Sequence, residues 1–114
     1  MREASMNDLI ERHRPELVEL CHRFRVKRLD LFGSAARETF HPESSDIDFL
    51  VTLEAPSPGE YADNYLNLAN SLEQLFHCRV DLVTERSIRN PYFREAVEAT
   101  RESVYDARSE KASA

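Results

Sequence analysis

The sequence predicts an α+β fold, a two-layer α/β arrangement in which a small mixed sheet carries helices on one face. Apolar residues at helical spacing alternate along the chain with short apolar stretches typical of strands. A short turn between the first two expected strands favours antiparallel pairing, and a long helical stretch before the third allows parallel pairing. We expect a single domain over residues 1–108 and a frayed tail over 109–114.

Three helices are expected from apolar periodicity. Pro15 lies inside the first, which predicts a helix that kinks or restarts there. In the second, Ser57 is the expected N-cap, Pro58 the first helical residue and Glu60 the partner of a capping box. The last begins after Asn90 and Pro91. The periodic residues of the three are, in order, Leu9, His13, Leu17, Leu20, Cys21 and Phe24; Tyr61, Tyr65, Leu68, Leu72, Leu75 and Phe76; and Phe93, Val97, Thr100 and Val104.

Three strands are expected between these helices. Residues 26–32 alternate and end at Gly33, which predicts a strand followed by a sharp turn. The second strand covers residues 46–53 and ends at the proline-containing loop 54–59, and the third covers residues 79–84.

Composition argues against several classes of protein. No apolar run approaches the roughly 20 residues of a membrane span, and the first ten residues lack that of a signal peptide, so we expect a cytoplasmic protein. The net charge of −6 disfavours stable nucleic-acid binding by the molecule as a whole. Cys21 and Cys78 form no disulfide framework, and His41, His77 and Cys78 lack the spacing of a zinc site.

A glycine directly after a strand is informative here, because the chain has only two glycines. Gly33 precedes Ser34 and a helix-forming stretch that reaches Arg37. Glycine lets the backbone approach a ligand closely, and N–H groups at a helix start can hold a phosphate. Gly33 and Ser34 are therefore candidate phosphate-binding residues, although an ordinary strand-to-helix turn would look similar. Arg37 could steer a triphosphate or be a solvated helix residue.

A pair of aspartates marks the second strand. Asp46 and Asp48 lie two residues apart, so both side chains should point to one face of the sheet. Ile47, Phe49 and Val51 would then face the core.

Asp81 is a third acid, in Val-Asp-Leu-Val, where another apolar residue would be expected. If its strand lies beside the first two, three carboxylates meet near the Gly33 turn. Like charges this close are unfavourable unless a divalent cation takes up the charge, and carboxylate oxygens suit Mg²⁺. The sequence predicts that Asp46, Asp48 and Asp81 bind metal, where two ions could clamp a triphosphate. The alternative is that the acids protect an edge strand against aggregation.

These motifs together carry a resemblance. Leu-Phe-Gly-Ser, ten further residues, Ser-Asp-Ile-Asp-Phe-Leu-Val and later Val-Asp-Leu-Val closely resemble the minimal nucleotidyltransferases of the DNA polymerase β-like superfamily. The resemblance covers about residues 25–84, and residues 88–105 look like that family's closing helix. It implies the polymerase-β-like nucleotidyltransferase fold.

The resemblance also implies a role for each candidate residue. Gly33 and Ser34 would hold the β- and γ-phosphates of ATP, and Asp46 and Asp48 would bind two Mg²⁺ ions. Asp81 would join one metal site and help to activate the acceptor hydroxyl. The sequence departs from the family in the turn, where Glu38 replaces the usual second glycine and the spacer is about one residue longer. These departures concern the phosphate turn and leave the predicted metal site unaffected.

The activity implied by the resemblance is transfer of AMP from Mg²⁺-ATP to a hydroxyl, with release of pyrophosphate. Minimal members often resemble antitoxins encoded beside a HEPN-type ribonuclease toxin, which some of them inactivate by adenylylating a tyrosine. Because 114 residues leave little room for an acceptor domain, we expect the acceptor to be such a cognate HEPN-type toxin. Two alternatives remain, namely a binding module that neutralises its partner by occlusion and a small-molecule nucleotidyltransferase whose acceptor pocket forms by self-association.

Overall fold

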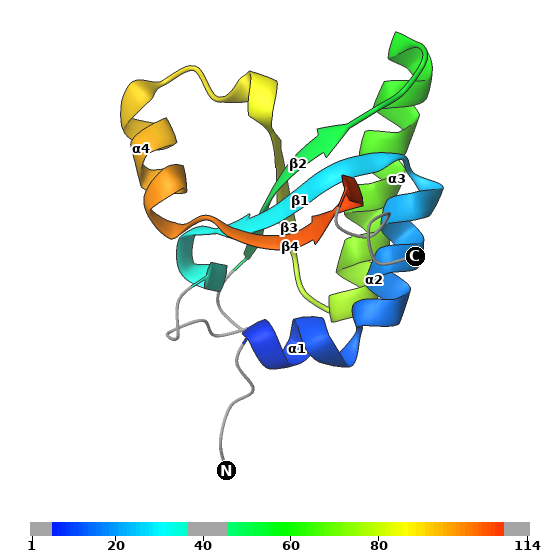
Figure 1. The fold of residues 1–114 in the computed structure, drawn as a ribbon, viewed down its shortest axis with the longest axis horizontal. Helices are drawn as coiled ribbons and strands as arrows, with labels where there is room; N and C mark the ends of the chain where they lie inside the picture. Colours follow the sequence, from blue (N-terminus) through cyan, green and yellow to red (C-terminus); the bar gives the residue numbers. More distant parts are fainter. Residues whose placement is uncertain (1–5, 37–45, 109–114) are drawn as a thin grey trace.

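The computed structural model describes residues 6–36 and 46–108, and its helices and strands are labelled in Figure 1. The helices are α1 (Met6–Arg12), α2 (Arg14–Arg23), α3 (Pro58–Phe76) and α4 (Pro91–Thr100), and the strands are β1 (Val26–Phe32), β2 (Ile47–Leu53), β3 (Val80–Thr84) and β4 (Glu102–Asp106). Short 3₁₀ turns at Gly33–Ala36 and Glu85–Ser87 follow β1 and β3.

The strands form one mixed sheet in the order β3-β2-β1-β4. β1 pairs antiparallel with both β2 and β4, and β2 pairs parallel with β3. The predicted α+β class and the antiparallel pairing of the first two strands are thereby confirmed, although residues 33–46, which connect them, are longer than the short turn expected. The pairing across the helical connection is parallel.

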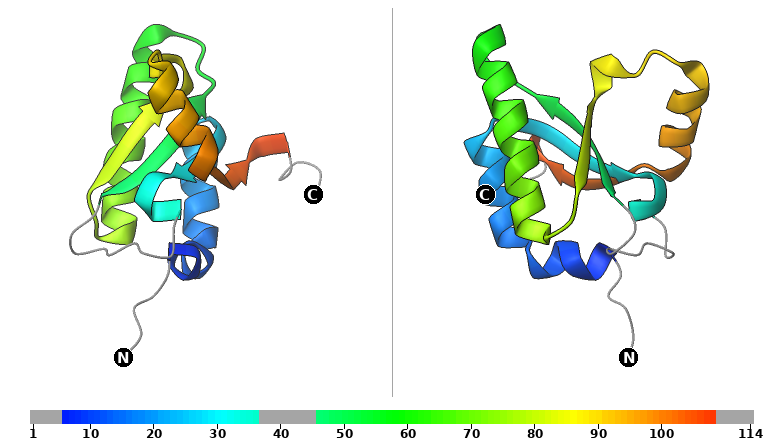
Figure 2. Two further views of the ribbon diagram at one scale, coloured as in Figure 1. Left: turned by 90° about the vertical axis from the view of Figure 1, so that its left-hand side faces the viewer. Right: turned by 180° about the vertical axis from the view of Figure 1, so that it is seen from behind.

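The core lies between one face of the sheet and the helices α2 and α3 (Figure 2). Leu17 and Cys21 of α2 and Leu68 and Leu72 of α3 are fully buried there. Ile47, Phe49 and Val51 of β2 face the same core, as their alternation with the aspartates predicts.

The helix boundaries follow the predicted signals. The first helical stretch breaks at His13, and Pro15 lies in the first turn of α2. Ser57 Oγ accepts a hydrogen bond from Glu60 N at 3.2 Å, which confirms the N-cap of α3. The Glu60 carboxylate lies 3.3 Å from Arg25 Nε, so this acid forms an ion pair rather than closing the capping box.

The last segment differs from the prediction of one closing helix over residues 88–105. Helix α4 ends at Thr100, and residues 102–106 form β4, which adds a fourth strand beside β1. Val104 is therefore a buried strand residue and not part of a helical stripe. The three- and four-residue spacing from Val97 to Thr100 to Val104 imitates a helix, while pairing with β1 determines the actual structure.

Helix α4 lies on the sheet face opposite α2 and α3, as the right-hand view of Figure 2 shows, so the helices are not confined to the one face that the sequence predicted. Its Val97 is fully buried against Phe32, Leu50 and Ile88. Asp48 and Asp81 alternate with core-facing residues and therefore belong to this second face. No helix within residues 6–36 and 46–108 is long and apolar enough to cross a membrane.

Candidate active site

The turn after β1 brings Gly33 directly against Asp48. Phe32, the last residue of β1, is the antiparallel partner of Asp48, so the turn begins where the β2 carboxylate lies. Gly33 has a φ of +66°, and a Cβ placed on it would lie 2.6 Å from Asp48 Oδ2. Glycine is thus required twice here, once by the left-handed backbone and once by the close approach of the carboxylate.

The strand register brings Asp81 beside Asp48. The two residues are direct partners in the parallel pairing of β2 and β3. Asp46 precedes β2, and its carboxylate lies 3.3 Å from Nε of Arg79, which precedes β3. The structure therefore places the three predicted acids at the beginning of two neighbouring strands, next to the Gly33 turn.

The electrostatics of Asp48 reflect this crowding. Burial, followed by the charges of Asp81 and Asp46, raises the pKa of the Asp48 carboxyl from 3.8 to about 6. Burial and then Asp81 also raise the pKa of Tyr65, whose hydroxyl donates a hydrogen bond to the Leu82 carbonyl oxygen. Excess negative charge thus accumulates at the face where a cation is expected.

These acids suit Mg²⁺ because each provides hard carboxylate oxygens. Burial and the neighbouring carboxylates make the charged form of Asp48 unfavourable, and a bound cation would stabilise that form. Their present arrangement is incomplete. Among the described residues, no group of three or more His, Cys, Asp or Glu side chains is arranged so that it could hold a metal ion by itself. Asp46 pairs instead with Arg79. The carboxylates alone therefore form no complete metal site, and substrate phosphates would have to supply further ligands, as is usual for Mg²⁺.

The phosphate turn differs from the sequence expectation in one contact. Gly33 N–H donates a 2.9 Å hydrogen bond to Thr100 Oγ1, so it is not one of the free N–H groups expected there. The backbone of Ser34 lies in the 3₁₀ turn Gly33–Ala36. Arg37 and Glu38, the other residues considered for this turn, lie outside the described residues.

Sequence reasoning missed the polar contacts behind the turn. Asp30 of β1 is fully buried and pairs with Arg101, and its carboxylate also lies 3.2 Å from Arg28 Nε. Arg101 further contacts Glu98 at 2.6 Å and Glu85 at 3.1 Å. An aspartate between two leucines of β1 was the available signal, but its partner is 71 residues away in the sequence.

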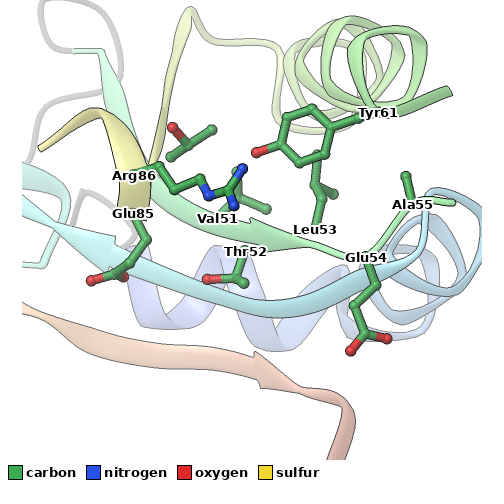
Figure 3. Close-up of a pocket in the computed structure, with 9 residues that line it drawn as sticks. Val51, Thr52, Leu53, Glu54, Ala55, Tyr61, Glu85 and Arg86 are labelled. Atoms are coloured by element: carbon green, nitrogen blue, oxygen red, sulfur yellow. The ribbon is translucent and has the colours of Figure 1, made fainter. Parts of the chain in front are cut away.

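A separate hollow lies at the opposite end of β2 and β3 (Figure 3). Its volume is about 410 Å³, and the side chains of Tyr61 and Arg86 point into it. None of the predicted site residues lines it.

Comparisons with known proteins converge on one family. A family model described as a nucleotidyltransferase domain matches residues 15–104. Two curated proteins of Methanocaldococcus jannaschii, each named "putative protein adenylyltransferase", are 33% and 34% identical over 95 residues, covering 83% of this chain and 90% of theirs. A solved structure described as a "putative minimal nucleotidyltransferase" is 32% identical, with a TM-score of 0.68 and coverage of 90% of this chain and 98% of that one.

More distant structures share the fold. A toxin–antitoxin crystal structure with AMP-PNP is 22% identical with a TM-score of 0.61, covering 84% of this chain and 75% of that one. A tri-AMPylated Shewanella oneidensis HEPN toxin in complex with an MNT antitoxin provides a chain 18% identical with a TM-score of 0.58, covering 90% of this chain and 76% of that one.

Proposed function

The chain belongs to the nucleotidyltransferase domain family, and from this premise we propose that it transfers AMP from Mg²⁺-bound ATP to a hydroxyl group of another protein. The observation that carries this proposal is the contact of Gly33 with Asp48, which has Asp81 as its strand partner. The turn that we propose to bind phosphate is therefore adjacent to the carboxylates. The names of the relatives, protein adenylyltransferases, support a protein as acceptor.

Asp46, Asp48 and Asp81 are the residues that would hold Mg²⁺. Bound there, the metal would neutralise charge on the triphosphate and on the departing pyrophosphate. Gly33 and Ser34 would orient the β- and γ-phosphates, and Asp81, which is exposed, would accept the proton of the attacking hydroxyl. The oxygen of that hydroxyl forms a bond to the α-phosphorus while the bond from this phosphorus to pyrophosphate breaks. Arg37 remains a candidate for steering the triphosphate.

The proposed acceptor is a tyrosine of a cognate HEPN-type toxin, which makes this chain an antitoxin acting in the cytoplasm. Two structures of similar fold are toxin–antitoxin complexes, one of them with an AMPylated HEPN toxin. Charge supports the pairing, because a chain of net charge −6 is attracted to the basic surface with which a ribonuclease holds RNA.

A transfer assay tests the proposal. The chain is incubated with ATP, Mg²⁺ and the product of the neighbouring gene, and mass spectrometry should find one or more AMP groups on a tyrosine of that product. Asp48→Asn should abolish the modification, whereas Asp63→Asn, which changes an exposed acid of α3, should not. If Asp48→Asn neutralises the partner equally well in an unmodified complex, the chain acts by occlusion. Modification of a small molecule alone would point to the third alternative.

Metal dependence provides an independent test. A ligand that binds only the folded chain at 100 times its dissociation constant stabilises it by about 2.7 kcal/mol. ATP with Mg²⁺ should therefore raise the melting temperature clearly, and ATP with EDTA much less. Equal shifts in both solutions would contradict metal-dependent binding.

A further inference from the structure

The junction between α4 and β4, formed by Thr100 and Arg101, contacts the candidate site from behind. Thr100 Oγ1 accepts the 2.9 Å hydrogen bond from Gly33 N–H and itself donates to the Ala96 carbonyl oxygen at 3.2 Å. A hydroxyl has one proton and two lone pairs, so donation to Ala96 fixes its rotation and directs a lone pair at Gly33. The backbone of α4 therefore determines where the Gly33 amide is held.

Small movements of Gly33 matter because there is no room for a side chain between this residue and Asp48. A Cβ placed on Gly33 would be 2.6 Å from Asp48 Oδ2, so the Gly33 backbone lies close to that carboxylate. Glycine readily adopts the left-handed φ of +66°. Glycine also has more accessible backbone conformations than any other residue, so Gly33 can easily leave this one. A hydrogen bond at its N–H restricts that freedom.

The junction is itself held in place by charge. Arg101 pairs with Asp30, which is the one fully buried charged residue within 6–36 and 46–108, and Asp30 lies on β1 three residues before Gly33. The Arg101 side chain is 17% exposed and also contacts Glu85, which follows β3. Strand β1, the end of β3 and α4 are thus joined at the residue next to Thr100.

We propose that Thr100 is a positioning residue, whose hydroxyl holds the Gly33 turn beside Asp48 in the geometry that receives the nucleotide triphosphate. The proposal rests on the proposed function only in naming the nucleotide as the ligand of the turn. Thr100 touches neither phosphate nor metal in this scheme and acts through Gly33. A purely structural Thr100 would contribute to folding stability and leave the turn and its ligand affinity unchanged.

The two glycines allow a direct readout of the turn. A sample labelled with ¹⁵N-glycine gives two amide resonances, from Gly33 and Gly59, and the exposed Gly59 serves as an internal control. Thr100→Val keeps the side-chain shape and removes the hydroxyl, so the Gly33 amide should shift and exchange with solvent at least about tenfold faster while the Gly59 resonance stays in place. Thr100→Ser should restore the wild-type resonance. Ser103→Ala removes an exposed hydroxyl nearby and should change neither resonance.

Ligand affinity is then measured with Mg²⁺ and a non-hydrolysable ATP analogue, at a temperature where each variant is folded. We expect about twofold to tenfold weaker binding for Thr100→Val and wild-type binding for Thr100→Ser and Ser103→Ala. Wild-type affinity in Thr100→Val, or an unchanged Gly33 resonance, overturns the positioning role and leaves the proposed function intact. If Thr100→Val does not fold, Thr100→Ser is the deciding variant, because it keeps the hydroxyl. A Gly33 resonance at the wild-type position in Thr100→Ser then supports the proposal, and a displaced one refutes it. A wild-type chain that does not bind the analogue overturns both proposals.

Discussion

Replacing Gly33 by alanine provides the sharpest test of the site geometry. Two effects act together. The left-handed backbone at φ +66° costs a residue with a Cβ about 1–2 kcal/mol, and the new methyl group would lie 2.6 Å from Asp48 Oδ2, where relief of overpacking costs about 1–3 kcal/mol more. We expect Gly33→Ala to lower the free energy of unfolding by about 2–5 kcal/mol. Because the methyl group must displace the Asp48 carboxylate, nucleotide binding should fall as well.

The other glycine supplies the matched control. Gly59 lies in the first turn of α3, and a Cβ placed on it meets nothing within 4 Å. Gly59→Ala should therefore stabilise the chain by about 0.4–1 kcal/mol, since alanine restricts the unfolded chain and fits a helix without strain. Both variants are measured by urea unfolding and by binding of Mg²⁺ with a non-hydrolysable ATP analogue.

The reasoning fails if the two variants behave alike. Equal stabilities for Gly33→Ala and Gly59→Ala, together with wild-type affinity for the nucleotide analogue in both, would show that Gly33 is an ordinary turn residue and that its contact with Asp48 has no role. Lower stability with unchanged affinity in Gly33→Ala would confirm the backbone argument but separate the turn from the nucleotide site.

Three further predictions concern charged residues. The pKa of Asp48 is about 6 in the folded chain, above its ordinary 3.8, so the stability that this carboxyl contributes is present at low pH and is lost as pH rises through about 6. Urea unfolding should therefore find Asp48→Asn more stable than wild type at pH 7, with the difference vanishing below about pH 4. Arg101→Ala should lower the unfolding free energy by about 3 kcal/mol, because buried Asp30 loses its main partner, and adding Asp30→Asn should recover part of this loss, as a double-mutant cycle would show. Arg79→Gln removes an exposed partner of Asp46, so the free energy of unfolding should change by less than about 1 kcal/mol. Calorimetry should find tighter Mg²⁺ binding in this variant, because Arg79 no longer competes for the Asp46 carboxylate.

The parts of the fold that are determined by residues close together in the sequence could be predicted. The start of α3 follows from Ser57 and Pro58, and the break before α2 follows from Pro15. The adjacency of Asp48 and Asp81 was predictable for a different reason. Strands that follow one another in the sequence are usually neighbours in a sheet, and in the order observed β2 lies between β1 and β3 and pairs these two residues directly.

The missed parts depend on contacts between distant segments. The spacing of Val97, Thr100 and Val104 imitates a helix, and strand β4 forms because β1, a distant segment, offers it hydrogen-bonding partners. The burial of Asp30 likewise requires Arg101, 71 residues away. The contact of Thr100 with Gly33 follows only after α4 has turned back toward β1. The residues next to each segment in the sequence therefore do not predict these pairings.

The three aspartates, equivalent in the sequence motif, differ physically. Asp48 is half-buried and has the raised pKa, so it bears most of the penalty of like charge. Asp81 is exposed and directly beside it. Asp46 is 46% exposed and already compensated by Arg79. A cation gains most where negative charge is least compensated, so we expect Asp48 and Asp81 to be the first residues to bind it. Asp46 would join more readily once its carboxylate leaves Arg79, an exposed side chain that a bound triphosphate, itself anionic, would attract.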